Sequence, residues 1–220
     1  MLVLLLLACN GTAIEARGDE YALEFNDKGC AAAPLDGRAQ TTALTIEATV
    51  RGNENPDFGS YPVLHWTDRL LLAELDDGRT WFGSTDTSTG GVIDVNGFMD
   101  GQTHHLAGTW DEGGRIELWV DGTRIGFADL ESSGAGETLE IGCWNTDWSF
   151  QGLIDEVRIS SVVRYTESFE ADLGPFRVDD DTIALWHFDE GEGTLFRDAA
   201  TGYDGTLEDV DWVPFDTTGD

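Results

Sequence analysis

The chain consists of many short apolar or alternating segments separated by glycine, aspartate and asparagine, and this pattern limits the possible folds most strongly. Asp121-Gly122, between two such segments, predicts a type I′ hairpin turn. Only SSVVRYTESF, at 160–169, has a helix-like pattern, long enough for a short helical turn. We therefore expect an all-β chain with two antiparallel sheets, as a sandwich or jelly roll. The predicted strands are residues 21–25, 44–50, 61–66, 70–75, 104–110, 115–120, 123–128, 139–143, 152–159 and 182–188.

The charge of the chain limits its partners. Twelve basic residues against 43 acidic ones give a net charge of −31 among 220 residues. Such a surface repels nucleic acid and anionic membranes, so neither is an expected partner. Two interpretations of the acidic residues stay open: a strongly hydrated soluble surface, or a surface that attracts divalent cations.

The N-terminal residues are typical of an export signal. The seven apolar residues 2–8 are too few to cross a bilayer, which needs about 20, but they match the end of a secretory hydrophobic region. Leu6-Leu7-Ala8-Cys9 also resembles a bacterial lipobox, whose cysteine carries the lipid. We expect a signal segment at 1–9, a polar tether at 10–20, and a lipid anchor at Cys9 in the bacterial cell envelope, facing the periplasm or the cell surface. Export without a lipid and a cytosolic location are the alternatives.

Cys30 and Cys143 remain if Cys9 is lipidated, an even pair in an oxidising compartment. They either form a disulfide or are two separate buried thiols. The chain contains no CxxC or cysteine–histidine spacing that would favour zinc.

Several motifs occur in a consistent order from residue 21 onward. The longest are THHLAGTWDEGGRIELWVDGTRIG at 103–126, FQGLIDEVRISSVVRY at 150–165 and ALWHFDEGEGTLFRDAATGYDGTL at 184–207, and YALEFND and LTIEATV precede them. Together they resemble the laminin-G-like jelly roll of the concanavalin A-like lectin/glucanase superfamily. The resemblance implies one such domain over residues 21–213, with an acidic C-terminal tail at 214–220.

Asp155 interrupts an apolar pattern in FQGLIDEVRI. Strict strand alternation places Leu153, Asp155, Val157 and Ile159 on one face, where a carboxylate needs compensation. The resemblance implies that an acid here could hold a structural Ca²⁺ ion with other oxygen ligands, for which Asp198 and Asn26 are candidates. The alternative is that Asp155 only accepts hydrogen bonds from the backbone.

Sequence motifs for catalysis are missing. The Glu-x-Asp-x-x-Glu pattern of related glucanases, the GxSxG motif and phosphate-binding glycine loops do not occur. We therefore expect no catalytic residues, and a polysaccharide-active hydrolase or lyase is the alternative.

CWNTDW, at 143–148, is the strongest candidate for ligand binding. Trp144 and Trp148 could stack on sugar rings while Asn145 and Asp147 bind hydroxyl groups, or the tryptophans could instead cap the core. Trp119 is a weaker candidate on the opposite face of its strand from Leu118. The sequence thus predicts a non-catalytic binding or adhesion module for a glycan or extracellular protein. A purely structural envelope lipoprotein is a further alternative.

Overall fold

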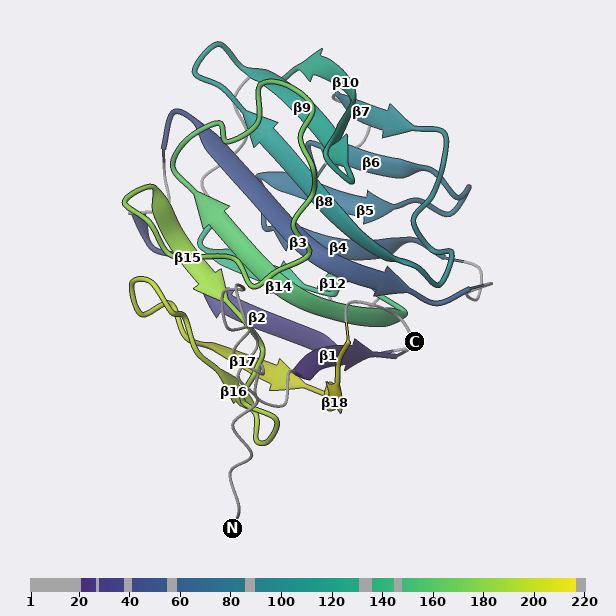
Figure 1. Cartoon of the computed structure of the whole chain (residues 1–220), viewed down its shortest axis with the longest axis vertical. Helices are drawn as coiled ribbons and strands as arrows, with labels where there is room; N and C mark the ends of the chain where they lie inside the picture. The colour runs from purple at the N-terminus through teal and green to yellow at the C-terminus, as the bar shows by residue number, and fades with distance from the viewer. Residues whose placement is uncertain are drawn as a thin grey trace, which may run out of the picture.

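The alternating segments form antiparallel strands that pack as two large sheets face to face (Figure 1). The structure is a computed structural model that describes residues 21–26, 28–37, 41–54, 59–85, 90–130, 136–144 and 148–216. Among these residues no helix is long and apolar enough to span a membrane. The fold is an all-β jelly-roll sandwich, as the sequence predicts.

The first sheet contains the longest strands, with β3 and β14 in its middle. Its β15 pairs with the second half of β14, beyond the part that pairs with β1. In spatial order its strands are β10 (Thr123–Asp129), β9 (Arg115–Val120), β8 (Thr103–Trp110), β3 (Leu44–Gly52), β14 (Gly152–Ser160), β1 (Tyr21–Phe25) and β18 (Asp211–Pro214), with β15 (Thr182–Trp186) beside β14.

The second large sheet has a separate two-stranded hairpin beside it, β12 (Cys143–Trp144) with β13 (Trp148–Ser149), and this hairpin carries Trp144 and Trp148. In spatial order its strands are β16 (Leu195–Phe196), β17 (Gly205–Glu208), β2 (Cys30–Pro34), β11 (Thr138–Ile141), β4 (Tyr61–Trp66), β5 (Leu70–Glu74), β6 (Thr80–Gly83) and β7 (Gly91–Asp94).

The core lies between the two sheets and consists of the inward-facing side chains of both. The core includes Leu70 and Leu72 of β5 and Phe82 of β6. The adjacent residues Leu71 and Trp81 face outward. Fully burying each large apolar side chain stabilises the fold by about 1.5–3 kcal/mol. This period-two pattern is why the strands could be predicted from the sequence.

All ten predicted segments contain strands, and Gly142 divides 139–143 into β11 and β12. The predicted turn is confirmed, because Asp121 and Gly122 both have positive φ, 48° and 73°, as a type I′ turn requires. The short strands β2, β6, β7, β13, β16, β17 and β18 were not predicted.

The prediction of a helical turn at 160–169 is wrong. Residues 161–181, which we call the strap, contain no helix or strand and cross over the outer face of the first sheet (Figure 1). Hydrogen bonds to the sheet hold the strap at several points along its length. Arg164 N–H donates to Thr45 Oγ1, Phe169 N–H donates to the Gly122 carbonyl, and the Leu173 carbonyl accepts from Thr49 Oγ1.

The predicted alternation along β14 is also wrong, because the strand contains a β-bulge. Ile154 pairs with Val50 and Val157 with Ala48, so β14 has one more residue than β3 over this stretch. The bulge brings Ile154 and Val157 to the core face together and takes Asp155 out of the apolar stripe. Asp155 is 8% exposed and has a partner in the structure.

Candidate ligand-binding site

The hairpin β12–β13 is attached to the sandwich through Gly142, the residue directly before it. Gly142, with a φ of 71°, turns the chain away from β11, and a Cβ atom here would lie 2.3 Å from the Phe25 ring. Its N–H donates to the Val63 carbonyl, and its own carbonyl accepts from Phe150 N–H. Only glycine fits this turn without moving the Phe25 ring.

A disulfide holds the next residue, Cys143, to Cys30 of β2, which confirms the bridged alternative. Their Cα atoms are 5.1 Å apart, within the usual range of about 4.4–6.8 Å. The disulfide therefore attaches the hairpin that carries Trp144 to the second sheet.

Trp144 and Trp148 are direct cross-strand partners in this hairpin, so both side chains lie on the same face of it. Trp148 is 44% exposed, and its ring lies beside Gly59. Trp144 is half-buried and packs on the outer face of the second sheet. Asn145 and Asp147, the polar residues predicted beside them, lie outside the described residues.

The surface beneath Trp144 is apolar. Leu71, Ala73 and Trp81 form a cluster on the outer face of the second sheet, separate from the main core. The Trp81 ring covers Gly91, where a Cβ atom would lie 2.3 Å from it, so the absence of a side chain at Gly91 lets the indole lie close to the sheet. Ile93, the strand partner of Trp81, is 39% exposed and extends this surface. We call Trp144, Trp148, Trp81 and Ile93 the tryptophan face.

Two polar residues adjoin the tryptophan face, and the sequence analysis missed both. His65 of β4 and Glu140 of β11 are strand partners, and His65 Nδ1 lies 2.7 Å from Glu140 Oε2. The Trp144 ring packs on the His65 ring, with centroids 5.2 Å apart and planes at 36°. The only signal in the sequence is the alternation along β4: Trp66 faces the core, so its neighbour His65 faces outward.

Trp119, the weaker predicted candidate, cannot contact a ligand directly. It is fully buried, and its ring packs against Tyr165 and Phe169 of the strap. The prediction placed it correctly on the outer face of its sheet, but the strap covers that face.

The predicted calcium ligands are not brought together. Asn26 lies level with the start of β14, because its neighbour Phe25 pairs with Gly152. Asp198 lies level with the second half of β14, because its bridge partner Trp186 pairs with Val157. Gly152 and Val157 are five positions apart, or roughly 16 Å of strand, and Asp155 lies between them. Among the described residues no group of three or more His, Cys, Asp or Glu side chains could hold a metal ion.

Asp198 has a different role. Its carboxylate accepts hydrogen bonds from the N–H groups of Leu185 of β15 and of Ala200, Thr201, Gly202 and Tyr203 in the following loop. Burial raises the pKa of Asp198, but these hydrogen bonds outweigh it and hold the pKa below its ordinary value. Asp198 thus organises the 198–203 loop. A calcium site that uses Asp155 with other ligands stays a prediction.

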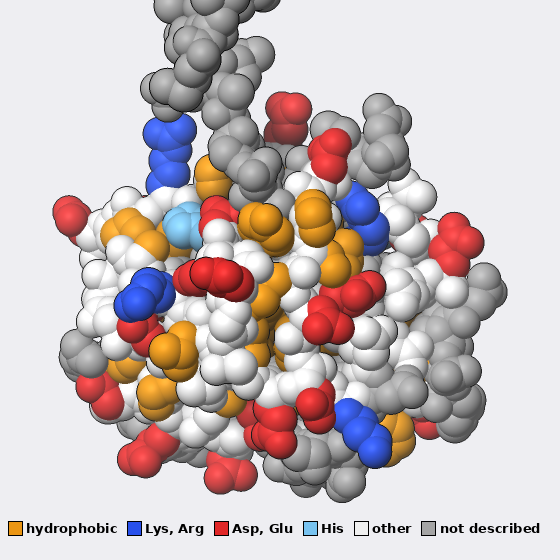
Figure 2. Space-filling model, turned by 90° about the horizontal axis from the view of Figure 1, so that it is seen from below, with side chains coloured by type: hydrophobic (Ala, Val, Ile, Leu, Met, Phe, Trp, Pro, Cys, Tyr) orange, Lys and Arg blue, Asp and Glu red, His pale blue; other side chains and the backbone are white. Residues whose placement is uncertain are grey.

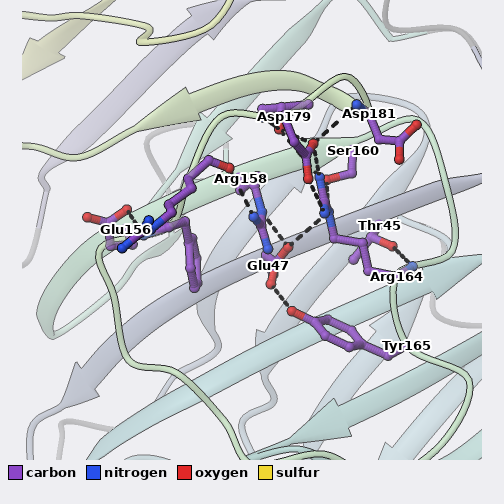
Figure 3. A network of polar contacts seen from close by, with 12 residues as sticks. Thr45, Glu47, Glu156, Arg158, Ser160, Arg164, Tyr165, Asp179 and Asp181 are labelled. Atoms are coloured by element: carbon purple, nitrogen blue, oxygen red, sulfur yellow. Dashed lines mark hydrogen bonds and ion pairs between the residues drawn. The ribbon is translucent and has the colours of Figure 1, made fainter.

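The outer face of the first sheet carries a buried polar network beneath the strap (Figure 3). Glu47 of β3 is fully buried and accepts hydrogen bonds from His105, from Arg158 and from the Tyr165 hydroxyl of the strap. Burial alone would raise the pKa of Glu47, but the hydrogen bonds from His105 and Arg158 and the Arg158 charge hold it below its ordinary value. Burial and the Glu47 charge raise the pKa of Tyr165.

Arg164 extends this network to the far end of the strap, where its guanidinium binds both oxygens of Asp179. These contacts anchor the strap to the sheet, although His105 Nδ1, at the edge of the network, has no hydrogen-bond partner among the described residues. Glu47 is fully buried beneath the strap, and the partners described here come from the sheet and from the strap.

A cavity of about 300 Å³ lies where the strap curves over the sheet. Its walls combine three aromatic rings, two arginines and two carboxylates: Tyr165, Phe169, Phe176, Arg158, Arg177, Glu170 and Asp172. Arg158 is already bound to Glu47, and its guanidinium lies over the Phe176 ring. Two of the lining residues, Arg158 and Tyr165, therefore also belong to the network that holds the strap.

Residues 26–168 match the family model for the concanavalin A-like lectin/glucanases superfamily. A search of curated proteins gives no significant match. The crystal structure of a "putative carbohydrate binding protein" from Bacteroides ovatus is similar, with a TM-score of 0.72 and 18% identity over 90% of this chain. This chain spans 60% of the length of that protein.

Two further structures match a smaller share of this chain. A structure described as "Cell entry of botulinum neurotoxin type C is dependent upon interaction with two ganglioside molecules" has a TM-score of 0.50 and 9% identity, over 70% of this chain and 40% of that one. Domains LG4-5 of the mouse laminin alpha1 chain have a TM-score of 0.49 and 20% identity, over 70% of this chain and 45% of that one. At these identities the likenesses with TM-scores of 0.50 and 0.72 establish the fold alone, and the family model establishes the family. The chain belongs to the concanavalin A-like lectin/glucanases superfamily, as a laminin-G-like domain.

Proposed function

We propose that the protein is a non-catalytic binding module that recognises carbohydrate through the tryptophan face. The observation that carries this proposal is the exposed indole of Trp148, paired across a disulfide-anchored hairpin with Trp144. Exposed aromatic rings held on a rigid support stack on sugar rings with little loss of side-chain freedom. The description of the Bacteroides ovatus structure supports a carbohydrate ligand over an extracellular protein.

The polar groups of the face fit the same ligand. Sugars offer hydroxyl groups around an apolar ring face, and His65 with Glu140 adjoins the stacked tryptophan. A glycan array screened with the folded domain tests this proposal. Binding that competes with a soluble sugar supports it, and an array without any binding contradicts it.

Polysaccharide cleavage is the alternative within the same superfamily. An assay for reducing ends and for unsaturated products, on the glycans that bind, separates a binding module from a hydrolase or lyase. A domain that binds no glycan and cleaves none would favour the structural envelope role.

The N-terminal pattern supports a location in the bacterial cell envelope, with a lipid on Cys9 as the membrane attachment. The variant Cys9→Ser should then move from the membrane fraction to the soluble fraction. Unchanged membrane partitioning of that variant would contradict the lipid anchor.

A further inference from the structure

We propose that His65, held in place by Glu140, accepts a hydrogen bond from a ligand hydroxyl beside Trp144, and that the ligand is an uncharged sugar. This inference rests on the proposed function, because it assigns the polar contact and the charge class of the same site.

Glu140 determines which nitrogen of His65 is available. A carboxylate only accepts hydrogen bonds, so the Nδ1 atom, 2.7 Å from Glu140 Oε2, carries the proton that it donates. In the neutral imidazole the Nε2 atom is then an acceptor. The contact is well shielded, because the side chains of His65 and Glu140 are only 4% and 17% exposed.

The second nitrogen of His65 is unused. Nδ1 binds Glu140 and the ring packs on Trp144, but Nε2 makes no hydrogen bond with the described part of the chain. A ligand that stacks on the tryptophan face would bring its hydroxyl groups to this position. The matching group is a hydroxyl donor, because Nε2 offers a lone pair.

The surrounding charge excludes anionic ligands. Glu140 lies beside His65 on the neighbouring strand, and the turn between β5 and β6, at the Leu75 end of the face, adds Asp76 and Asp77 against a single Arg79. The whole molecule carries −31, and acidic side chains are spread over the face shown in Figure 2, with fewer basic ones between them. A uronate or sulfate group would meet repulsion both at long range and at the site. Neutral sugars meet none.

Calorimetric titration tests the charge class first. The probes are neutral gluco-, manno-, xylo- and galacto-hexasaccharides, with polygalacturonate and dextran sulfate as anionic probes. We expect binding of at least one neutral probe and of neither anionic probe. Preferred binding of an anionic probe would overturn the inference.

Variants then test the role of His65 with the best neutral probe. His65→Ala should weaken binding about tenfold, the equivalent of one hydrogen bond, and His65→Gln should restore part of it because its amide oxygen can accept. Glu140→Gln should also weaken binding, because an amide no longer fixes the Nδ1 proton. The melting temperature of each variant is measured alongside.

Monodeoxy derivatives of that probe separate a direct contact from a structural effect. Removal of the contacting hydroxyl should weaken binding to the wild type and leave binding to His65→Ala unchanged. If Trp148→Ala loses binding while His65→Ala does not, the inference is overturned and the proposed function stands. If no probe binds the wild type, both are overturned.

Discussion

Cys143, bound to Cys30 through a disulfide, directly precedes Trp144, so the covalent link and the candidate binding residue are neighbours in one short strand. The hairpin belongs to neither large sheet, and it is held to them by this bond, by the turn at Gly142 and by packing of Trp144. Stability and binding should therefore depend on the same disulfide.

The double variant Cys30→Ser/Cys143→Ser should be less stable than the wild type by about 4–5 kcal/mol, because the bond closes a loop across a separation of 113 residues. Urea unfolding measures the difference, with Cys9→Ser as the matched thiol control. The same variant should bind glycan more weakly. Equal stability, or two titratable thiols in the exported wild-type protein, would contradict the bond.

Glu47→Gln should destabilise the domain by about 3–5 kcal/mol, because it leaves Arg158 buried without its counter-charge and presents an amide to several donors. Urea unfolding gives the magnitude, and limited proteolysis within 161–181 reports release of the strap. Glu208→Gln, at an exposed position of β17, is the control and should change neither. Intact protease resistance in Glu47→Gln would show that the network does not anchor the strap.

Stability should depend on pH through His104. Its hydrogen bond to Asp121, with a second to Asp100, outweighs burial and raises the pKa of His104 above its ordinary value of 6.5. A raised pKa in the folded state contributes stability that is fully present below about pH 6.5 and is lost as pH rises through the folded value. The free-energy difference between wild type and His104→Gln should thus shrink as the pH rises above about 6.5. A difference that stays constant or grows would contradict the raised pKa.

Calcium binding at Asp155 is still a prediction. If Asp155 ligates Ca²⁺, the ion should stabilise the fold by about 2.7 kcal/mol at a hundredfold excess over its dissociation constant. Asp155→Asn should abolish this response, because the site would lose a charged ligand. Thermal melts of both proteins in EDTA and in calcium measure it. Identical wild-type melts in the two buffers would leave Asp155 as a hydrogen-bonded acid.

Sequence reasoning located the elements whose pattern is local. The strands with period-two burial and the Asp121-Gly122 turn follow from neighbouring residues, whereas the sequence left open whether Trp148 is exposed. β2, with the sequence CAAAP, has weak strand propensity and forms because β11 and β17 pair with it on both sides.

The remaining features depend on contacts between distant residues. The bulge at Asp155 shows only in the register against β3, and side chains of the same strand hold the strap at Val162, Arg164 and Leu173. His65 and Glu140 are 75 residues apart in the chain and meet only after β4 and β11 pair. A single sequence contains no signal for such a pair.

Titration of wild type, Trp148→Ala and Phe127→Ala with the neutral hexasaccharides measures whether the tryptophan face binds the sugar. Phe127 is the matched control, an aromatic residue on β10 that is 58% exposed and lies outside the tryptophan face. We predict that Trp148→Ala weakens binding about tenfold or more, at an unchanged melting temperature, because the stacking surface is lost. Phe127→Ala should bind like the wild type. Equal glycan affinity of Trp148→Ala and wild type, or an equal loss in Phe127→Ala, would contradict the account.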